Sequence, residues 1–418
     1  MKRLCLVLIV FITLLLALPG VARAQDEITV ISSSTLSMFP NGITFNVEAE
    51  SDAQITDIDL KYRIKRLSVV PVSYRIDVDF TPGARVAASW TWNMLETGGL
   101  PPGTEVEYWW LIEDASGHRS ETSPASIKFA DLRYDWNSLT SDQIALYWHQ
   151  GDQSFAQELM DAAHGALQRL ASDTGVSLDQ VVSIYIYANS EELRGALIFP
   201  YEWTGGIAFC DFSTIAIGIA PHDLAWGKRT TAHELAHMVV HQAVFGPFGH
   251  IPVWLDEGLA VYTEGELRSD FRSHLDDAIS EDELISVRSL ASSFPTDPDE
   301  ARLSYAESYS LVVFLLDNYG QGKILELLDV FKQGSGYDDA LIQVYGFDMD
   351  GLNELWRASL GLGTQSTGMP DEIGEASGCL ASLKTTKGTH DTWGGIGLGV
   401  LLLFPAMVFA LHRVRRGK

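Results

Sequence analysis

The stretch from Thr231 to His241 constrains this 418-residue chain more than any other feature of its sequence. It contains His233, Glu234 and His237 in the order HExxH, surrounded mainly by small and apolar residues. Apolar neighbours favour a buried helix, and residues four apart on a helix lie one above the other. The imidazoles of His233 and His237 would then point at one spot, close enough to share a zinc ion. Glu234 lies beside them, in a position suited to a general base rather than a ligand.

A catalytic zinc site needs a third protein ligand and an open fourth position. Glu257 is the candidate, twenty residues after the second histidine, inside the segment Trp254–Tyr262 that reads WLDEGLAVY. A metzincin would have Gly at position 240 and His at position 243, but Val240 and Ala243 stand there, which excludes that class. A thermolysin-like helix would have Asp four residues after the ligand Glu, where this chain has Val.

Together, HELAH and WLDEGLAVY resemble the gluzincin pattern, and they are particularly similar to zinc aminopeptidases, whose second motif reads W-L-N-E-G-[FL]-A. The broader resemblance is to the peptidase MA-like domain family of bacterial secreted and membrane proteins. A third block of that family, Y-x-x-[SG] at the start of a long apolar helix, is matched by the segment Tyr305–Leu316. The resemblance implies a zincin-like fold, one Zn²⁺ ion as cofactor and a peptide or protein as substrate.

Residue by residue, the resemblance implies three zinc ligands, His233, His237 and Glu257. It implies Glu234 as the general base and Tyr305 as the phenol that stabilises the developing oxyanion. Tyr309, one turn further along the same predicted helix, is the alternative to Tyr305.

Two departures limit what the resemblance implies about substrate. The interval between the second histidine and Glu257 is one residue longer than in the aminopeptidases, and the G-A-M-E-N segment that anchors the substrate amine there is absent from this sequence. Exopeptidase specificity is therefore not implied. The segment Gly205–Phe209 occupies a comparable place. It is either an edge strand that pairs with an extended peptide or a Gly-Gly turn before an ordinary core strand.

Several polar residues near these motifs have open roles. Asp256 is expected either to accept a hydrogen bond from a ligand histidine or to cap or solvate its helix. His241 lies two turns beyond the first ligand histidine, about 12 Å along the helix, so it cannot join the same ion. Surface or loop roles are expected for the histidines without ligand spacing, of which the first two are candidates for lining the cleft: His222, His250 and His274.

Net charge, the N-terminal segment and the cysteine count limit the possible partners and the cellular location. The chain has 29 basic and 55 acidic residues, a formal net charge of -26, which repels nucleic acid phosphates and excludes nucleic acid as a partner. Residues 1–24 have a basic start, an apolar run and a small-residue cleavage pattern, which predict a signal peptide. Cys5 belongs to that segment, so only Cys210 and Cys379 remain and no disulfide scaffold is expected.

The N-terminal region alternates apolar and polar residues with a period of two, as in residues 58–64 and 74–80. Six or seven short antiparallel strands in about 100 residues predict an immunoglobulin- or fibronectin III-like β-sandwich over residues 25–130. Its tryptophans are expected in the core and rim rather than in a sugar-binding platform. The sequence leaves open whether the sandwich binds a partner, and it does not identify one.

Residues 131–360 are predicted to form the α+β zincin-like domain. A small mixed sheet precedes a metal-binding helix that follows Pro221-His222-Asp223 and ends near Val244. Further helices are expected near 268–279, 304–319, 322–333 and 348–360, separated by glycine-rich breaks.

The C-terminal region predicts attachment to a membrane. Residues 361–391 have the composition of a flexible stalk, and residues 392–411 form an uncharged run long enough to span a bilayer. The basic residues at 412–418 predict a short cytoplasmic tail, and therefore a single-pass cell-membrane protein with its folded domains outside the cytoplasm. The predicted function is that of an extracytoplasmic zinc metallopeptidase. The alternative is a catalytically inactive binding or scaffold protein of the cell surface.

Overall fold

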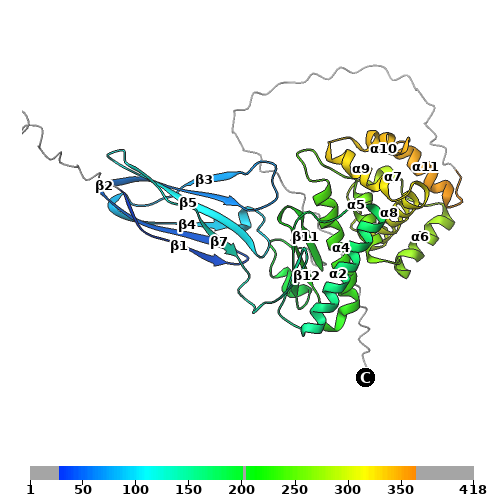
Figure 1. The fold of residues 1–418 in the computed structure, drawn as a ribbon, viewed down its shortest axis with the longest axis horizontal. Helices are drawn as coiled ribbons and strands as arrows, with labels where there is room; N and C mark the ends of the chain where they lie inside the picture. The colour runs from blue at the N-terminus through cyan, green and yellow to red at the C-terminus, as the bar shows by residue number, and fades with distance from the viewer. Residues whose placement is uncertain (1–27, 201–203, 364–418) are drawn as a thin grey trace, which may run out of the picture. The chain divides into compact units, whose positions relative to one another are not determined.

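The computed structural model describes residues 28–200 and 204–363, and the chain divides into two compact units (Figure 1). Among the described residues, the first unit comprises residues 28–65 and 70–130, and the second comprises residues 66–69, 131–200 and 204–363. The predicted signal peptide, transmembrane segment and tail, and the predicted stalk from residue 364 onward, lie outside the described residues. The domain boundaries proposed from the sequence stay predictions.

The first unit is a seven-stranded antiparallel sheet. Its strands are β1 (Thr29–Met38), β2 (Gly42–Ile64), β3 (Ser73–Asp77), β4 (Gly83–Asn93), β5 (Thr104–Asp114), β6 (Arg119–Glu121) and β7 (Ala125–Phe129), with a short 3₁₀ helix at Met94–Glu96. The β-rich character agrees with the sequence prediction, but one strand is much longer than the short strands that were expected. The 23-residue β2 pairs with β1 and β4 along its first half and with β3 and β5 along its second half. The long strand β2 therefore connects the pair β1 and β4 to the pair β3 and β5.

The second unit contains a five-stranded mixed sheet in the order β11-β12-β10-β9-β8. Its strands are β8 (Asn137–Ser141), β9 (Ile144–Trp148), β10 (Val182–Tyr187), β11 (Gly206–Phe209) and β12 (Thr214–Gly218). The three central strands are parallel, whereas β11 runs antiparallel to β12 and β8 antiparallel to β9. The segment around Gly206 is therefore an edge strand of this sheet, and its pairing with a peptide stays a prediction.

Helices make up the rest of the second unit (Figure 1). They are α2 (Gln153–Thr174), α3 (Ser190–Arg194), α4 (Leu224–Ala243), α5 (Val253–Glu264), α6 (Ser269–Glu281), α7 (Val287–Leu290), α8 (Pro298–Tyr319), α9 (Gly322–Lys332), α10 (Tyr337–Tyr345) and α11 (Met349–Ser359), with short 3₁₀ helices at Cys210–Phe212 and Pro221–Asp223. The expected helix after Pro221-His222-Asp223 is confirmed as α4.

Helix α4 lies at the centre of the second unit. It packs against α2, α5 and the strands β11 and β12. Leu235, Met238 and Val239 are fully buried in the core that these elements share. Burial on several sides explains why the apolar residues of this helix do not form a single stripe. The packing fixes the direction in which the histidines of α4 point.

Helices α5 and α8 approach each other closely at Gly258. A Cβ added there would lie 2.4 Å from the backbone oxygen of Ser308 and 2.7 Å from Cγ2 of Val312. Real Cβ atoms do not approach other atoms this closely, so only glycine permits the contact. The residue next to Glu257 therefore sets the distance between the two helices.

Replacing Gly258 with alanine is expected to lower the free energy of unfolding by about 2–3 kcal/mol, because the overpacked helices must move apart. Urea unfolding followed by circular dichroism measures this loss. Gly165→Ala on α2 is the matched control, since a Cβ at Gly165 meets nothing within 4 Å. That control should be neutral or stabilising by about 0.5–1 kcal/mol. Equal stability of the two variants would contradict the close approach.

The predicted membrane-spanning architecture and single-pass localisation require correction. Among residues 28–200 and 204–363, no helix is both long enough and apolar enough to cross a membrane. The two longest helices, α2 and α8, have charged residues in several turns, such as Glu158 and Asp161 in the first and Glu307 and Asp317 in the second. The predicted span at 392–411 lies outside the described residues, and the structure gives no support for membrane anchoring.

Candidate metal centre and adjoining pocket

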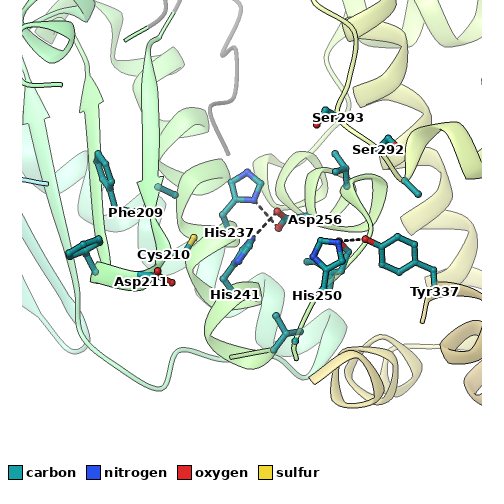
Figure 2. A pocket seen from close by; sticks show the side chains of 17 residues that line it. Phe209, Cys210, Asp211, His237, His241, His250, Asp256, Ser292, Ser293 and Tyr337 are labelled. Carbon is teal, nitrogen blue, oxygen red and sulfur yellow. Dashed lines mark hydrogen bonds and ion pairs between the residues drawn. The ribbon is translucent and has the colours of Figure 1, made fainter. Parts of the chain in front are cut away.

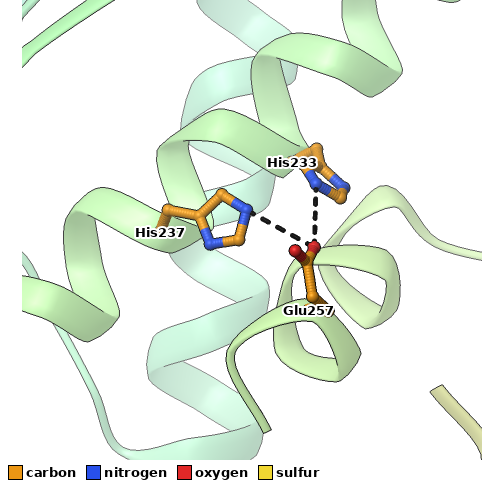
Figure 3. A group of neighbouring side chains, drawn as sticks. All are labelled: His233, His237 and Glu257. Atoms are coloured by element: carbon orange, nitrogen blue, oxygen red, sulfur yellow. Dashed lines mark ion pairs between the residues drawn. The ribbon is translucent and has the colours of Figure 1, made fainter. Parts of the chain in front are cut away.

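Helices α4 and α5 bring the three predicted ligands together. The Nε2 atoms of His233 and His237 lie 3.6 Å and 3.7 Å from Oε2 of Glu257 (Figure 3). One ligand atom from each of the three residues lies within 4.8 Å of the other two. The side chains of His237 and Glu257 are almost completely buried. Two residues one helical turn apart and a third from the next helix thus face one point.

This arrangement fits a zinc ion. Tetrahedral zinc with bonds of about 2.0–2.2 Å has ligand atoms roughly 3.3 Å apart, close to the separations observed. Neither carboxylate oxygen of Glu257 has a hydrogen-bond partner among the described residues. Burial raises the pKa of Glu257 to about 8. A buried carboxyl group of this kind is costly unless a cation lies beside it, and the adjoining imidazoles supply the remaining ligands.

A carboxylate behind each histidine fixes its orientation. The Nδ1–H of His233 donates to Oε1 of Glu264 over 2.8 Å, and that of His237 donates to Oδ1 of Asp256 over 2.9 Å. Because Nδ1 is occupied in each ring, Nε2 faces the centre, as metal ligation requires. Of the roles considered for Asp256, the structure shows a hydrogen bond to His237.

The contact of Glu264 was not predicted from the sequence. A thermolysin-like helix would place Asp four residues after the ligand, but Val261 stands there. Glu264 lies three residues further along α5, on nearly the same face. The signal that could have revealed it is an acidic residue within one turn of the missing position.

His241 lies outside the group of three, as its helix rise predicted. Its Nε2–H donates to Oδ2 of Asp256 over 3.0 Å, so one carboxylate bridges two imidazoles of α4 (Figure 2). Burial alone would raise the pKa of Asp256, but His237 and His241 together hold it well below its usual value. Asp256 is therefore a buried anion that holds two histidines of α4 in place.

Glu234 is completely buried beside the three candidate ligands. Neither of its carboxylate oxygens has a hydrogen-bond partner among the described residues. Burial raises the pKa of Glu234 to about 7, in the range where a carboxylate can take up and return a proton. Gly206 of β11 makes room for it, since a Cβ there would lie 2.7 Å from Oε1 of Glu234.

Tyr305 lies nearer to the centre than its rival Tyr309. The ring of Tyr305 is 6.4 Å from that of His233, and it packs against Phe271 and Phe294 at 5.8 Å and 5.2 Å. Burial raises the pKa of Tyr305 well above its usual value, so its hydroxyl stays protonated and able to donate. Tyr309 instead packs against Tyr262 at 6.2 Å. The geometry favours Tyr305.

Two residues beyond Tyr305, Glu307 is a fully buried carboxyl group. Its Oε1 accepts a hydrogen bond of 3.0 Å from the backbone N–H of Ile285, while its Oε2 has no hydrogen-bond partner among the described residues. Burial raises its pKa from 4.5 to about 8. The protein therefore holds this group protonated at neutral pH.

Glu307 is expected to make stability fall as pH rises. Because the folded pKa lies above the unfolded value, its contribution is complete below pH 4.5 and is lost as pH rises through about 8. Glu307→Gln should flatten this dependence and stabilise the protein at pH 9 by up to about 4 kcal/mol. Urea unfolding between pH 5 and 9 tests it. Glu283→Gln, at an exposed position, should leave the wild-type profile unchanged, and a parallel profile in Glu307→Gln would refute the assignment.

A cavity of about 610 Å³ adjoins the centre on the side of His237 (Figure 2). We call it the side pocket, and it is lined by Ala208, Phe209, Cys210, Asp211, Phe212, His237, His241, Val244, Gly249, His250, Ile251, Val253, Asp256, Ala291, Ser292, Ser293 and Tyr337. His250, one of the two histidines considered as cleft-lining residues, lines the side pocket. Its ring stacks on that of Tyr337, with the ring centroids 5.5 Å apart. His222 does not line the side pocket, and His274 bonds to the backbone oxygen of Asp270 on α6.

The mixed sheet, the central helix and the buried cluster of histidines and carboxylates define a peptidase-like domain. Residues 162–361 match the family model of the Peptidase MA superfamily. The superfamily predicted from the motifs is therefore confirmed.

Comparison with solved structures gives distant likenesses. Aminopeptidase A of Legionella pneumophila has 11% sequence identity and a TM-score of 0.33, with 79% of this chain and 49% of that chain covered. OgpA of Akkermansia muciniphila has 13% identity and a TM-score of 0.20, with 26% of this chain and 28% of that chain covered. This chain thus spans less than a third of the OgpA chain. No curated protein matches the sequence.

Proposed function

We propose that this protein is a zinc-dependent metallopeptidase of the gluzincin type. The observation that carries the proposal is the position of Glu257, whose Oε2 lies 3.6 Å and 3.7 Å from the Nε2 atoms of His233 and His237. Glu234, buried beside them without a hydrogen-bond partner among the described residues, supports a role for it as the base. His233, His237 and Glu257 would hold the ion.

The chemistry is hydrolysis of a peptide bond. A bound zinc ion would polarise the scissile carbonyl and lower the pKa of the attacking water. Glu234 takes the proton from that water and delivers it to the leaving amine. The hydroxyl of Tyr305 donates a hydrogen bond to the carbonyl oxygen as negative charge develops, an effect of about 3 kcal/mol.

The edge strand β11 offers a place for the substrate backbone. The N–H of Gly218 donates to the oxygen of Gly205, and hydrogen-bonded pairs alternate along an antiparallel ladder. Gly206 and Ala208 therefore direct their backbone groups to the open edge. An extended peptide can add there as a further strand, with its backbone close to Glu234.

Metal analysis and a cleavage assay test the proposal. The purified full-length protein is expected to hold about one zinc per chain and to cleave bonds within a mixed peptide library. A chelator should abolish cleavage, and added zinc should restore it. Absence of metal, or cleavage that persists after zinc is removed, would overturn the proposal. Bound zinc without any cleavage would favour a catalytically inactive binding protein instead.

A further inference from the structure

The side pocket is placed to receive one side chain of a peptide on β11. Ala208 and Phe209, the last residues of β11, line the pocket, whereas Gly206 at the start of the strand faces Glu234. A peptide that pairs antiparallel with β11 runs in the opposite direction. Its residue beside Ala208 or Phe209 therefore precedes its residue beside Gly206, so the pocket lies on the N-terminal side of the bond that is cleaved.

The charges that face the side pocket are unbalanced. Two carboxylates line it, Asp211 and Asp256, together with the imidazoles of three histidines, while its 17 lining residues include no lysine or arginine. Asp256 is engaged by two imidazoles. The carboxylate of Asp211 forms no hydrogen bond or ion pair with other described side chains, and Figure 2 shows it beside Cys210. The pocket therefore retains an anionic group open to a ligand.

The other walls of the side pocket are largely apolar. They include Phe209, Phe212, Ile251 and Val253, and the rings of Tyr337 and His250 close one side. Long basic side chains bury their methylene stems on apolar surface while the charged end reaches a polar group. A chain with a net charge of -26 also attracts cationic peptides at long range.

We propose that the side pocket binds the side chain of an arginine or lysine on the N-terminal side of the scissile bond, with Asp211 as its counter-charge. This inference rests on the proposed peptidase function and names the substrate class of that site. The basic end pairs with the Asp211 carboxylate, and the stem lies along Phe209 and the apolar wall. Asp211 is then a specificity-determining residue, and it takes no part in bond cleavage.

Matched peptides that differ only at that position test the pocket. The wild type is expected to cleave the arginine and lysine peptides with a kcat/KM roughly tenfold above that of the leucine peptide, the scale of one charge-assisted hydrogen bond. In Asp211→Asn the ratio of arginine to leucine cleavage should fall roughly tenfold. Asp223→Asn removes the same charge at an exposed position outside the pocket and should leave the ratio unchanged.

Two results would overturn the inference. One is a wild-type preference for leucine or glutamate, and the other is an equal fall of the ratio in both variants, which would indicate only the overall charge. Binding to the zinc-loaded Glu234→Gln variant separates this inference from the peptidase proposal. By calorimetry, that variant should bind the arginine peptide more tightly than the leucine peptide, and adding Asp211→Asn should remove the difference. Selective binding without hydrolysis by the wild type would leave the pocket assignment intact and refute the peptidase.

Discussion

Glu234→Gln is expected to retain zinc and to lose peptide cleavage by roughly 10³-fold or more. Glutamine has the shape of glutamate but cannot accept a proton, and the side chain at this position is completely buried, so water cannot easily replace it as a base. The three candidate ligands are untouched by the change. Zinc content by mass spectrometry and kcat/KM on a fluorogenic peptide measure the two effects separately.

A matched control isolates the role of the base. Glu266→Gln makes the same change at an exposed position shortly after α5 and should keep both zinc and activity. Full activity of Glu234→Gln would exclude Glu234 as the base. Loss of zinc from it would instead make Glu234 a ligand, contrary to its position beside the group of three.

The grouping of the three candidate ligands could be predicted because their geometry is local. Four-residue spacing on one helix aligns His233 and His237 whatever the rest of the fold does, and Glu257 belongs to a second short motif with a clear helical pattern. The partners behind the histidines depend on how α4 and α5 cross. That crossing depends on tertiary contacts such as that of Gly258 with α8. The spacing of residues along the sequence does not indicate such contacts.

The course of β2 and the side pocket could not be predicted, because both depend on contacts between segments that are far apart in the sequence. The alternating segment at 58–64 was expected to be a short strand, yet it is the second half of the 23-residue β2, which has a register shift between Glu50 and Ile55. The Asp211 carboxylate and the side pocket also escaped the sequence interpretation. The pocket is assembled from β11, α4, α5, α10 and the connecting loops, and no single segment indicates it.

The most damaging single change at the centre is expected to be Glu257→Gln. A neutral amide replaces the only carboxylate among the three candidate ligands, and the site loses the negative charge that offsets a divalent cation in a buried environment. Zinc affinity should fall by well over the 10- to 100-fold that loss of a hydrogen-bonding partner behind a ligand typically costs. Competition with a fluorescent chelator measures the affinity.

Glu264→Gln is expected to have a smaller effect on zinc affinity than Glu257→Gln, because Glu264 contacts His233 on the side away from the centre. Its zinc affinity should fall about 10- to 100-fold, less than that of Glu257→Gln. Thermal unfolding gives an independent measure. Zinc that binds only the folded state raises Tm, so added zinc should stabilise the wild type strongly, Glu264→Gln less and Glu257→Gln hardly at all. If Glu257→Gln kept wild-type zinc affinity, the third ligand would have to be another residue, and the crossing of α4 and α5 would no longer account for the site.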